Sequence, residues 1–459
     1  MLLKDNSEKL KTILNSNNVL TTLEERYCYS CDAYNLQNEG KIPNSVVFVE
    51  TIEDVKKVLK FANEHGIPVV SRGAGTNMVG ACVCTKGGIV LNFSKMNKIL
   101  DLNVSNMTVR VQPGVILGDL KKAVEEVGLF YPPDPSNYKV STIGGSIAQS
   151  SGGAMSFKYG TTKDYVLSLK VVTASGELMT LGAETIKDAS GYHLSQLIVG
   201  SEGTLAIVVE AVLKLIPKPE TKRTISAYFK NVEDSVSTVN GIIAENIFPA
   251  AIDFMDKNSM LTVEEFTKCG LKTENECMLL IDLDGFESSM NTQIYKVQTI
   301  LEQNNAKEIV ISDKDEVWEA RRSSYAATAR LAPDVISDDI IVPREKLALM
   351  IKKCNEISQK YNLKMCLVGH VGDGNIHPQI ALNLENEDEF KNYISAKSEM
   401  YNTAVELGGT ISSEHGIGIE KLSYLENIID ANALEYMKLI KKAFDPKNIL
   451  NPGKIFKLD

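Results

Sequence analysis

Residues 141–160 read STIGGSIAQSSGGAMSFKYG, a run in which glycines and hydroxyl residues stand among few bulky side chains. Glycine lets the backbone approach a ligand closely, because no Cβ intervenes. Two further Gly-rich loops flank the run, RGAGTN at 72–77 and VGSEGT at 199–204. Because these loops lie inside a stretch of ordinary strands and helices, we expect backbone wrapped around a ligand here and not a free linker.

The sequence around these loops predicts a compact mixture of helices and strands. Helices are expected from a capping box at Thr51 and Asp54 to His65, and over 115–127 up to Gly128. A Rossmann fold is not expected, because Gly80 comes too late for a G-x-G-x-x-G motif and another strand follows it. Strands are expected at 43–50, 67–71, 88–93, 107–112 and 205–216, with a hairpin at 167–173 and 177–181.

After a boundary at 217–220 (PKPE) the pattern changes to the βαβ–βαβ order of a ferredoxin-like unit. Its strands are expected at 223–230, 250–255, 277–284 and 308–312, with helices at 233–246 and 291–304. One amphipathic helix is expected over 422–443, followed by a tail that packs back onto earlier residues. The expected division is a helical lead-in (1–42), a first domain (43–220), a second domain (221–413) and a C-terminal segment (414–459).

The composition excludes several classes of protein. The net charge of −10, without a basic run, argues against nucleic-acid binding. The 44% apolar content is that of a globular protein, and no window has the length of a signal peptide or membrane span. We therefore expect a cytoplasmic protein. The eight cysteines lack metal-site spacing, so no intrinsic iron–sulfur cluster is expected.

Three of the five histidines stand in two short motifs, GHVGDGNIH at 369–377 and SEHG at 413–416. Asp373-Gly374 favours a two-residue hairpin turn, which would place His370 directly opposite His377. Opposed Cβ atoms lie about 4.5–5.5 Å apart, close enough for two imidazoles to share a metal ion, with Glu414 as a third ligand. The alternative is that both are hydrogen-bonded core histidines.

Together these segments resemble the vanillyl-alcohol-oxidase / p-cresol-methylhydroxylase flavoproteins, and within them the D-lactate, glycolate and D-2-hydroxyglutarate dehydrogenase branch. The resemblance runs from about residue 43 to Lys454. It implies an α+β fold: a two-subdomain FAD-binding domain of the p-cresol-methylhydroxylase type, a ferredoxin-like substrate (cap) domain, and a C-terminal segment that returns to the FAD domain.

The resemblance also implies which residues surround FAD. Thr76 stands where relatives with a covalent flavin carry histidine, so the FAD is expected to be non-covalent. The implied cofactor residues are Arg72, Gly73, Ala74, Gly75, Thr76, Asn77, Pro133, Asp134, Thr142, Gly144, Gly145, Ser151, Gly152, Tyr159, Gly160, Glu202, Gly203, Ile207 and Asn451.

For the catalytic half, the resemblance implies one divalent metal (Zn, Fe or Mn) on His370, His377 and Glu414, with His415 as the acid–base residue. Arg321 falls at the position of the substrate arginine, although Arg322 and Arg330 compete for that role. Asn375 and Tyr325 complete the expected substrate site. Tyr325 departs from the family pattern, since relatives carry a threonine there, and this leaves open how the far end of the substrate is bound.

These residues suit the oxidation of a D-2-hydroxy acid. A metal lowers the hydroxyl pKa, a neutral histidine takes the proton, an arginine holds the carboxylate, and hydride passes to flavin N5. D-lactate is the favoured substrate, with glycolate and D-2-hydroxyglutarate as alternatives. Electrons are expected to pass to a partner such as an electron-transfer flavoprotein or an iron–sulfur subunit. The alternative from a different functional class is a non-catalytic subunit whose flavin only relays electrons. Alkyl-dihydroxyacetone-phosphate synthase chemistry is disfavoured because a second His-rich segment is missing.

Overall fold

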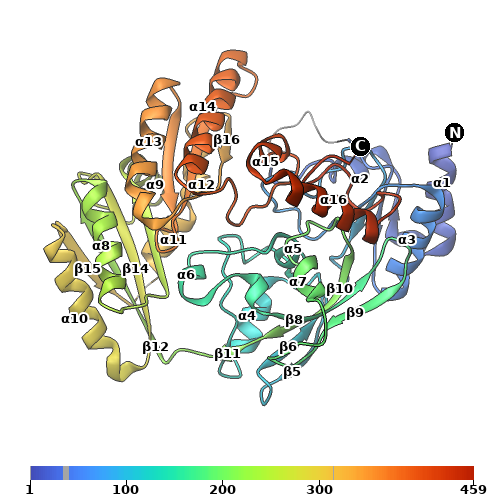
Figure 1. Cartoon of the computed structure of the whole chain (residues 1–459), viewed down its shortest axis with the longest axis horizontal. Helices are drawn as coiled ribbons and strands as arrows, with labels where there is room; N and C mark the ends of the chain where they lie inside the picture. Colours follow the sequence, from blue (N-terminus) through green and yellow to red (C-terminus); the bar gives the residue numbers. More distant parts are fainter. Residues whose placement is uncertain (1, 35–40, 314, 459) are drawn as a thin grey trace.

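The structure is a computed structural model that describes residues 2–34, 41–313 and 315–458, with only the backbone for residues 2–6. It confirms the predicted α+β class, and Figure 1 shows two parts side by side. Elements up to β11 (Ile216–Pro217) form the first part, and those from β12 (Thr221–Phe229) to α14 (Glu387–Glu406) form the second. The last two helices lie over the first part.

A small mixed sheet begins the first part, in the order β1–β2–β4–β3. Its three later strands are parallel, and β1 is antiparallel to β2. Helix α3 (Ile52–His65) connects β2 to β3 and begins at the predicted capping box, in which Thr51 and Asp54 accept each other's backbone N–H. The strands are β1 (Val19–Leu20), which the sequence did not predict, β2 (Ser45–Phe48), β3 (Val69–Arg72) and β4 (Ile89–Asn92). Short helices α1 (Leu2–Ile13) and α2 (Leu23–Tyr27) flank β1.

An antiparallel sheet in the order β5–β6–β10–β8–β9 completes the first part. The predicted hairpin is β8 and β9, whose turn contains Gly176 at φ 79°. The strands are β5 (Ile99–Asn103), β6 (Thr108–Val111), β8 (Val166–Val172), β9 (Leu178–Gly182) and β10 (Ile207–Lys214). Apolar residues of α4 (Leu117–Glu125), α5 (Ile143–Gln149) and α7 (Leu194–Ile198) pack on this sheet. The strands β7 (Leu129–Phe130) and β11 form a short antiparallel pair, and helix α6 (Ser156–Tyr159) contacts the second part.

The second part is built on the predicted ferredoxin-like unit. Its four strands lie in the order β15–β12–β14–β13, all antiparallel. The sheet then continues through β18 and β19, the hairpin predicted around Asp373-Gly374, and through β16, which the sequence did not predict. The strands are β13 (Ala251–Asp256), β14 (Cys277–Gly285), β15 (Glu308–Ser312), β16 (Asp334–Ser337), β17 (Ile340–Ile341), β18 (Lys364–Gly369) and β19 (Asn375–Leu382).

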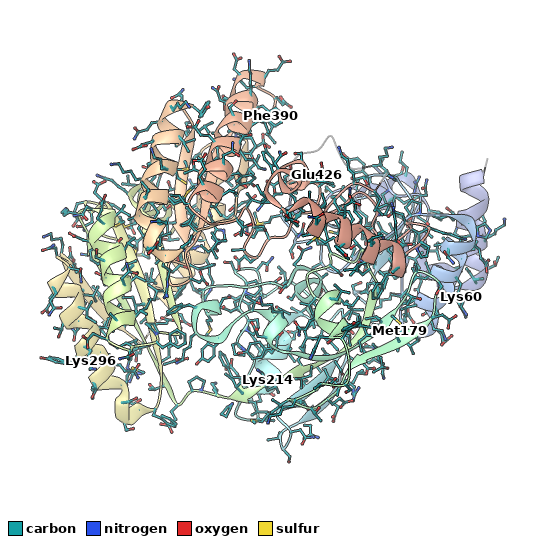
Figure 2. The ribbon with its side chains drawn as sticks, viewed as in Figure 1. Lys60, Met179, Lys214, Lys296, Phe390 and Glu426 are labelled. Atoms are coloured by element: carbon teal, nitrogen blue, oxygen red, sulfur yellow. The ribbon has the colours of Figure 1, made fainter. Side chains whose placement is uncertain are left out.

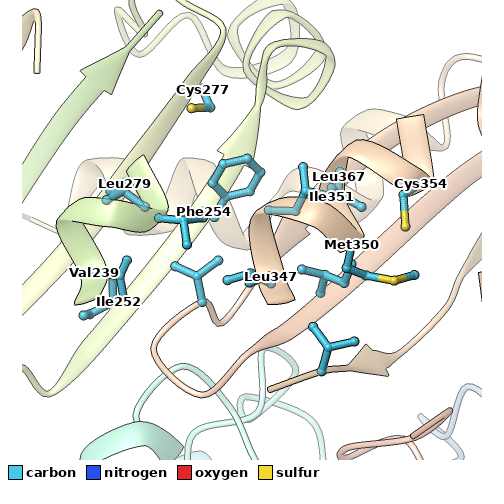
Figure 3. Packing of buried hydrophobic residues seen from close by; sticks show 14 of the residues in the cluster. Val239, Ile252, Phe254, Cys277, Leu279, Leu347, Met350, Ile351, Cys354 and Leu367 are labelled. Carbon is cyan, nitrogen blue, oxygen red and sulfur yellow. The ribbon is translucent and has the colours of Figure 1, made fainter. Parts of the chain in front are cut away.

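Helices cover both faces of this sheet. On one face, apolar side chains from α8 (Val232–Ala244), α10 (Glu287–Gln303), α13 (Leu347–Lys360) and α14 form one continuous cluster with β13. Figure 3 shows part of it, with Val239 of α8 and Leu347 of α13 near Ile252 and Phe254 of β13. Lys296 of α10 points away from it, at the outer edge of the molecule (Figure 2). On the other face, α9 (Lys257–Thr267), α11 (Glu316–Arg322) and α12 (Ser324–Thr328) pack against Ala251 and Met255.

The predicted single helix over 422–443 is wrong, because the structure has two helices, α15 (Leu422–Ile428) and α16 (Ala431–Phe444). Ile429 is extended, and the Asp430 carboxylate accepts the N–H groups of Asn432 and Ala433, which begins a new helix. This N-cap interrupts an apolar pattern that continues across it.

The tail returns to the first part as predicted. Leu450 bridges to Val69 of β3, and Asn451 donates its side-chain N–H groups to the carbonyls of Ala81 and Glu202. Among the described helices, none combines the length and the apolar character needed to cross a membrane.

Candidate functional site

A cavity of about 630 Å³ lies between the two parts of the molecule. Its volume is in the range of small-molecule and cofactor sites. The second part contributes Arg321, Tyr325 and His377 to its wall, and the connection after α14 contributes Glu414 and His415. The expected cofactor residues that line it are Arg72, Gly73, Ala74, Gly75, Thr76, Asn77, Thr142, Gly144, Gly145, Ser151, Gly152, Glu202, Gly203 and Ile207.

The cavity wall of the first part suits a polar, extended ligand. A Cβ on Gly73 would lie 2.1 Å from Thr142 Oγ1, so any residue larger than glycine would force these two loops apart. Ser141 Oγ, Ser146 Oγ and Gln149 Oε1 are buried in this wall without a hydrogen-bond partner among the described residues. A bound group with donors and acceptors would satisfy them. These residues therefore fit FAD, and they lie in the run 141–160 that was expected to surround a ligand.

Five expected cofactor residues do not line the cavity. Asp134 accepts the N–H of Met155, Tyr159 donates its hydroxyl to Asp284 at 2.6 Å, and Asn451 joins the loops of Ala81 and Glu202. Gly160 has a φ of 81°. The residues outside the lining set are Pro133, Asp134, Tyr159, Gly160 and Asn451.

The hairpin that carries two of the histidines is longer than predicted. Val368 of β18 lies opposite His377 of β19, so residues 370–374 form a five-residue loop and the predicted pairing of His370 with His377 is wrong. A two-residue turn of this type needs a positive φ at both central residues, whereas within this loop only Gly374 has one (90°). His370 nevertheless lies beside His377, with ring centroids 5.2 Å apart.

His370, His377 and Glu414 form the one group of potential metal ligands found among the described residues, with ligand atoms within 4.8 Å of one another. Glu414 Oε1 lies 3.6 Å from His370 Nε2 and 3.4 Å from His377 Nε2. Two imidazoles and one carboxylate suit Zn²⁺, Fe²⁺ or Mn²⁺ with coordination positions left open. The donor set therefore fits the divalent metal that the resemblance implies.

Burial and charge act in opposite directions on these groups. Burial lowers the pKa of His370, but hydrogen bonds to Asp253 and Glu414 outweigh it and raise the pKa well above the usual histidine value. Burial dominates at His377 and lowers its pKa to about 4. Burial raises the pKa of Glu414, yet the hydrogen bond from His370 brings it below normal. Glu414 therefore lies between one imidazole whose pKa is raised and one whose pKa is lowered.

A buried aspartate that sequence reasoning missed holds the loop of Glu414 and His415. Asp339 Oδ2 accepts the backbone N–H groups of Ser413, Glu414 and His415 at 2.8–2.9 Å. Burial raises the pKa of Asp339, but His415, Lys421 and His377 hold it well below normal. The signal for Asp339 is its place in the apolar stretch VISDDIIV (335–342), since an acidic residue there needs partners.

Of the three other expected residues, two line the cavity and one does not. His415 lines the cavity, and its ring stacks on that of His377. Tyr325 lines it too and donates its hydroxyl to Val335 O. Asn375 is outside the lining set, and its amide donates to Asp339 Oδ1 and Ile340 O.

The expected substrate arginine and its two competitors lie in different surroundings. Arg321 lines the cavity, but its Nε donates to buried Asp253 at 2.6 Å. Arg322 also lines the cavity, with its guanidinium over the ring of Trp318, whereas Arg330 lies over Phe266 outside the lining set.

Two family profiles match the chain. Residues 43–182 match the family described as FAD binding domain, and residues 218–455 match the C-terminal domain of FAD linked oxidases. The matched ranges follow the two parts of the molecule that meet at the cavity.

Individual proteins agree with these profiles. The chain is 43% identical to glycolate oxidase subunit GlcD of Bacillus subtilis, covering 100% of this chain and 98% of that protein. It is 36% identical to D-lactate dehydrogenase of Anaerostipes hadrus, over 90% and 89% of the two chains. Among solved structures, p-cresol methylhydroxylase with substrate bound has a TM-score of 0.84 at 16% identity, over 99% of this chain and 97% of the other, which shows the shared fold.

Proposed function

The chain belongs to the FAD-linked oxidases, and on that premise we propose that it oxidises a small D-2-hydroxy acid, D-lactate being favoured. The single observation that carries the proposal is the placement of His377, Glu414 and His415 on the wall of the cavity that the Gly-rich loops line. An electron-relay subunit would need none of these three side chains.

A bound FAD would supply a hydride acceptor, and a divalent metal on His370, His377 and Glu414 would supply a Lewis acid that lowers the pKa of the substrate hydroxyl. His415 takes the hydroxyl proton, because its ring lines the cavity next to the proposed ligand His377. Arg321 binds the substrate carboxylate through its guanidinium. Asp339 holds the backbone of Ser413–His415 and so keeps Glu414 and His415 in place.

The preference for D-lactate over glycolate rests on Val368. This apolar residue lines the cavity directly opposite His377 in the hairpin, where it would contact a methyl group on the α-carbon. One methyl in an apolar pocket is worth roughly 1–3 kcal/mol, or about 10- to 200-fold in specificity. Glycolate is the second candidate, because the Bacillus subtilis relative is named a glycolate oxidase subunit.

Anaerobic addition of D-lactate to the FAD-loaded protein tests the proposal. The flavin absorbance should bleach within turnover times, whereas L-lactate should leave it unchanged. If glycolate reduces the flavin with a higher kcat/KM than D-lactate does, glycolate is the preferred substrate. Val368→Thr, of similar size but polar, should lower kcat/KM for D-lactate more than for glycolate. If none of D-lactate, glycolate and D-2-hydroxyglutarate reduces the flavin, the relay function is correct instead.

We also propose that the electrons leave to a partner protein, an electron-transfer flavoprotein or an iron–sulfur subunit. The name of the relative at 43% identity describes a subunit, which supports this choice. The D-lactate-reduced protein should reoxidise slowly in air and rapidly with purified electron-transfer flavoprotein. Rapid reoxidation by oxygen alone would identify an oxidase.

A further inference from the structure

One buried carboxylate touches both the proposed metal site and the proposed substrate arginine. Asp253 is only 1% exposed. Its Oδ1 accepts from Arg321 Nε at 2.6 Å, and its Oδ2 lies 3.0 Å from His370 Nδ1. Strand alternation in β13 turns Asp253 toward the same face as Ala251 and Met255, where helix α11 with Arg321 packs.

The contact with Asp253 decides how the ring of His370 is used. A carboxylate accepts only, so His370 must carry a proton on Nδ1. That leaves Nε2, 3.6 Å from Glu414 Oε1, as the nitrogen available to a metal. A carboxylate behind a metal-binding histidine is a general means of fixing the tautomer and the ring orientation.

The same carboxylate fixes Arg321. The Nε of Arg321 is bound to Asp253, and its Nη1 lies 3.4 Å from Ser324 Oγ. The guanidinium is thereby held in one orientation while the residue still lines the cavity. Burying this arginine at 5% exposure without a counter-charge would be costly.

We propose that Asp253 is a positioning residue that orients the metal-binding nitrogen of His370 and the substrate-binding guanidinium of Arg321 together, and so couples the two sites. This inference rests on the proposed function, since it assigns Asp253 to the same substrate and metal. Glu414 and His377 complete the metal group but do not touch Arg321 in any described contact.

Asp253→Asn tests the coupling because an amide has one acceptor oxygen, whereas Asp253 accepts from Arg321 and from the Phe254 N–H on Oδ1 and from His370 on Oδ2. If the amide oxygen faces Arg321, the NH2 group faces His370 Nδ1. Nδ1 must then accept a hydrogen bond, so the ring proton is on Nε2 and Nε2 is not available to a metal. In the reverse orientation, Arg321 loses its partner. Zn²⁺ affinity, measured by competition with a chelator, should fall about 10- to 100-fold. The D-lactate concentration that half-saturates flavin reduction should rise about tenfold or more. FAD occupancy should stay at one per chain.

Asp256→Asn is the matched control. Asp256 lies on the same strand, is also buried (6% exposed), and accepts the N–H groups of Ser259 and Leu367 without touching either site. Its replacement should leave Zn²⁺ affinity and half-saturation unchanged. Asp253→Glu, which keeps two acceptor oxygens, should retain more Zn²⁺ affinity than Asp253→Asn.

Equal Zn²⁺ affinity and equal half-saturation in wild type and Asp253→Asn would overturn the positioning role and leave the proposed function intact. A wild-type protein without Zn²⁺ affinity would overturn the metal site as well. If Asp253→Asn does not fold, nitrogen NMR of the ¹⁵N-histidine-labelled, zinc-loaded wild type decides, with His370 identified by its loss in His370→Asn. The proton is expected on Nδ1 of His370, and a proton on Nε2 would contradict the inference.

Discussion

The imidazole rings of His377 and His415 stack, with centroids 5.2 Å apart and planes 13° from parallel. His415 Nδ1 is buried and has no hydrogen-bond partner among the described residues. Both rings line the cavity; His377 belongs to the potential metal group, and His415 does not. The stacking therefore brings a second imidazole next to the site where we propose that the substrate hydroxyl is bound.

His415→Asn should reduce the rate of flavin reduction by D-lactate about 10²- to 10⁴-fold, the usual effect of removing a general base. Stopped-flow absorbance measures the rate, and metal and FAD contents should stay at wild-type values. His193→Asn, at an exposed position, is the control and should have no effect. Flavin reduction at near wild-type speed in His415→Asn would assign the base to another group.

Removal of the metal should stop turnover without releasing the flavin. A chelator, or the double change His370→Ala/His377→Ala, should abolish D-lactate oxidation because two of the three potential ligands are lost. Elemental analysis should find less than about a tenth of an equivalent of metal, because metal binding depends on the ligands that have been removed. The flavin spectrum should persist. His65→Ala/His193→Ala serves as the control. Stoichiometric metal in the first double variant would show that the ligands are elsewhere.

FAD should be bound without a covalent link, because the loop Arg72–Asn77 along the cavity contains no histidine. Acid precipitation of the protein should leave all of the yellow colour in the supernatant. Colour that stays in the pellet would point to a covalent bond at another residue of the cavity wall.

Metal affinity should depend on pH through His370. In the metal-free protein the pKa of His370 is raised well above normal, so the ring carries a proton at neutral pH that a metal must displace. Below this raised pKa, Zn²⁺ affinity should therefore fall about tenfold for each pH unit of acidification, the result expected when one proton competes with the ion. Calorimetry in buffers of different ionisation enthalpy should detect the released proton. Affinity that is constant between pH 6 and pH 8 would contradict a protonated His370.

Local signals predicted much of the fold. The capping box at Thr51 and Asp54, the hairpin turn at Gly176 and the alternating elements after residue 220 each depend on neighbouring residues, and the structure contains them. The break at Asp430 was missed because the apolar pattern of a helix continues through it. The loop at 370–374 was misjudged because Asp-Gly permits a tight turn, whereas the pairing of β18 with β19 fixes a longer one.

The sequence predicted only some of the residues of the candidate site. The motifs GHVGDGNIH and SEHG pointed to the three histidines and Glu414, because glycines and polar residues cluster in them. Asp253 and Asp339 were missed, because each stands in an apolar strand region and contacts residues more than 60 positions away. Long-range partners of this kind become apparent only when the chain is folded, although a charge inside an apolar stretch is a usable warning.

The return of the tail also has a consequence for biosynthesis. Asn451 ties the loops of Ala81 and Glu202 together, and Lys454 donates to Val83 O. A ribosome makes these residues long after it has made the Gly-rich loops that they fasten. The flavin pocket therefore cannot be complete while earlier parts of the chain are emerging, and capture of the cofactor has to wait until synthesis has passed residue 454.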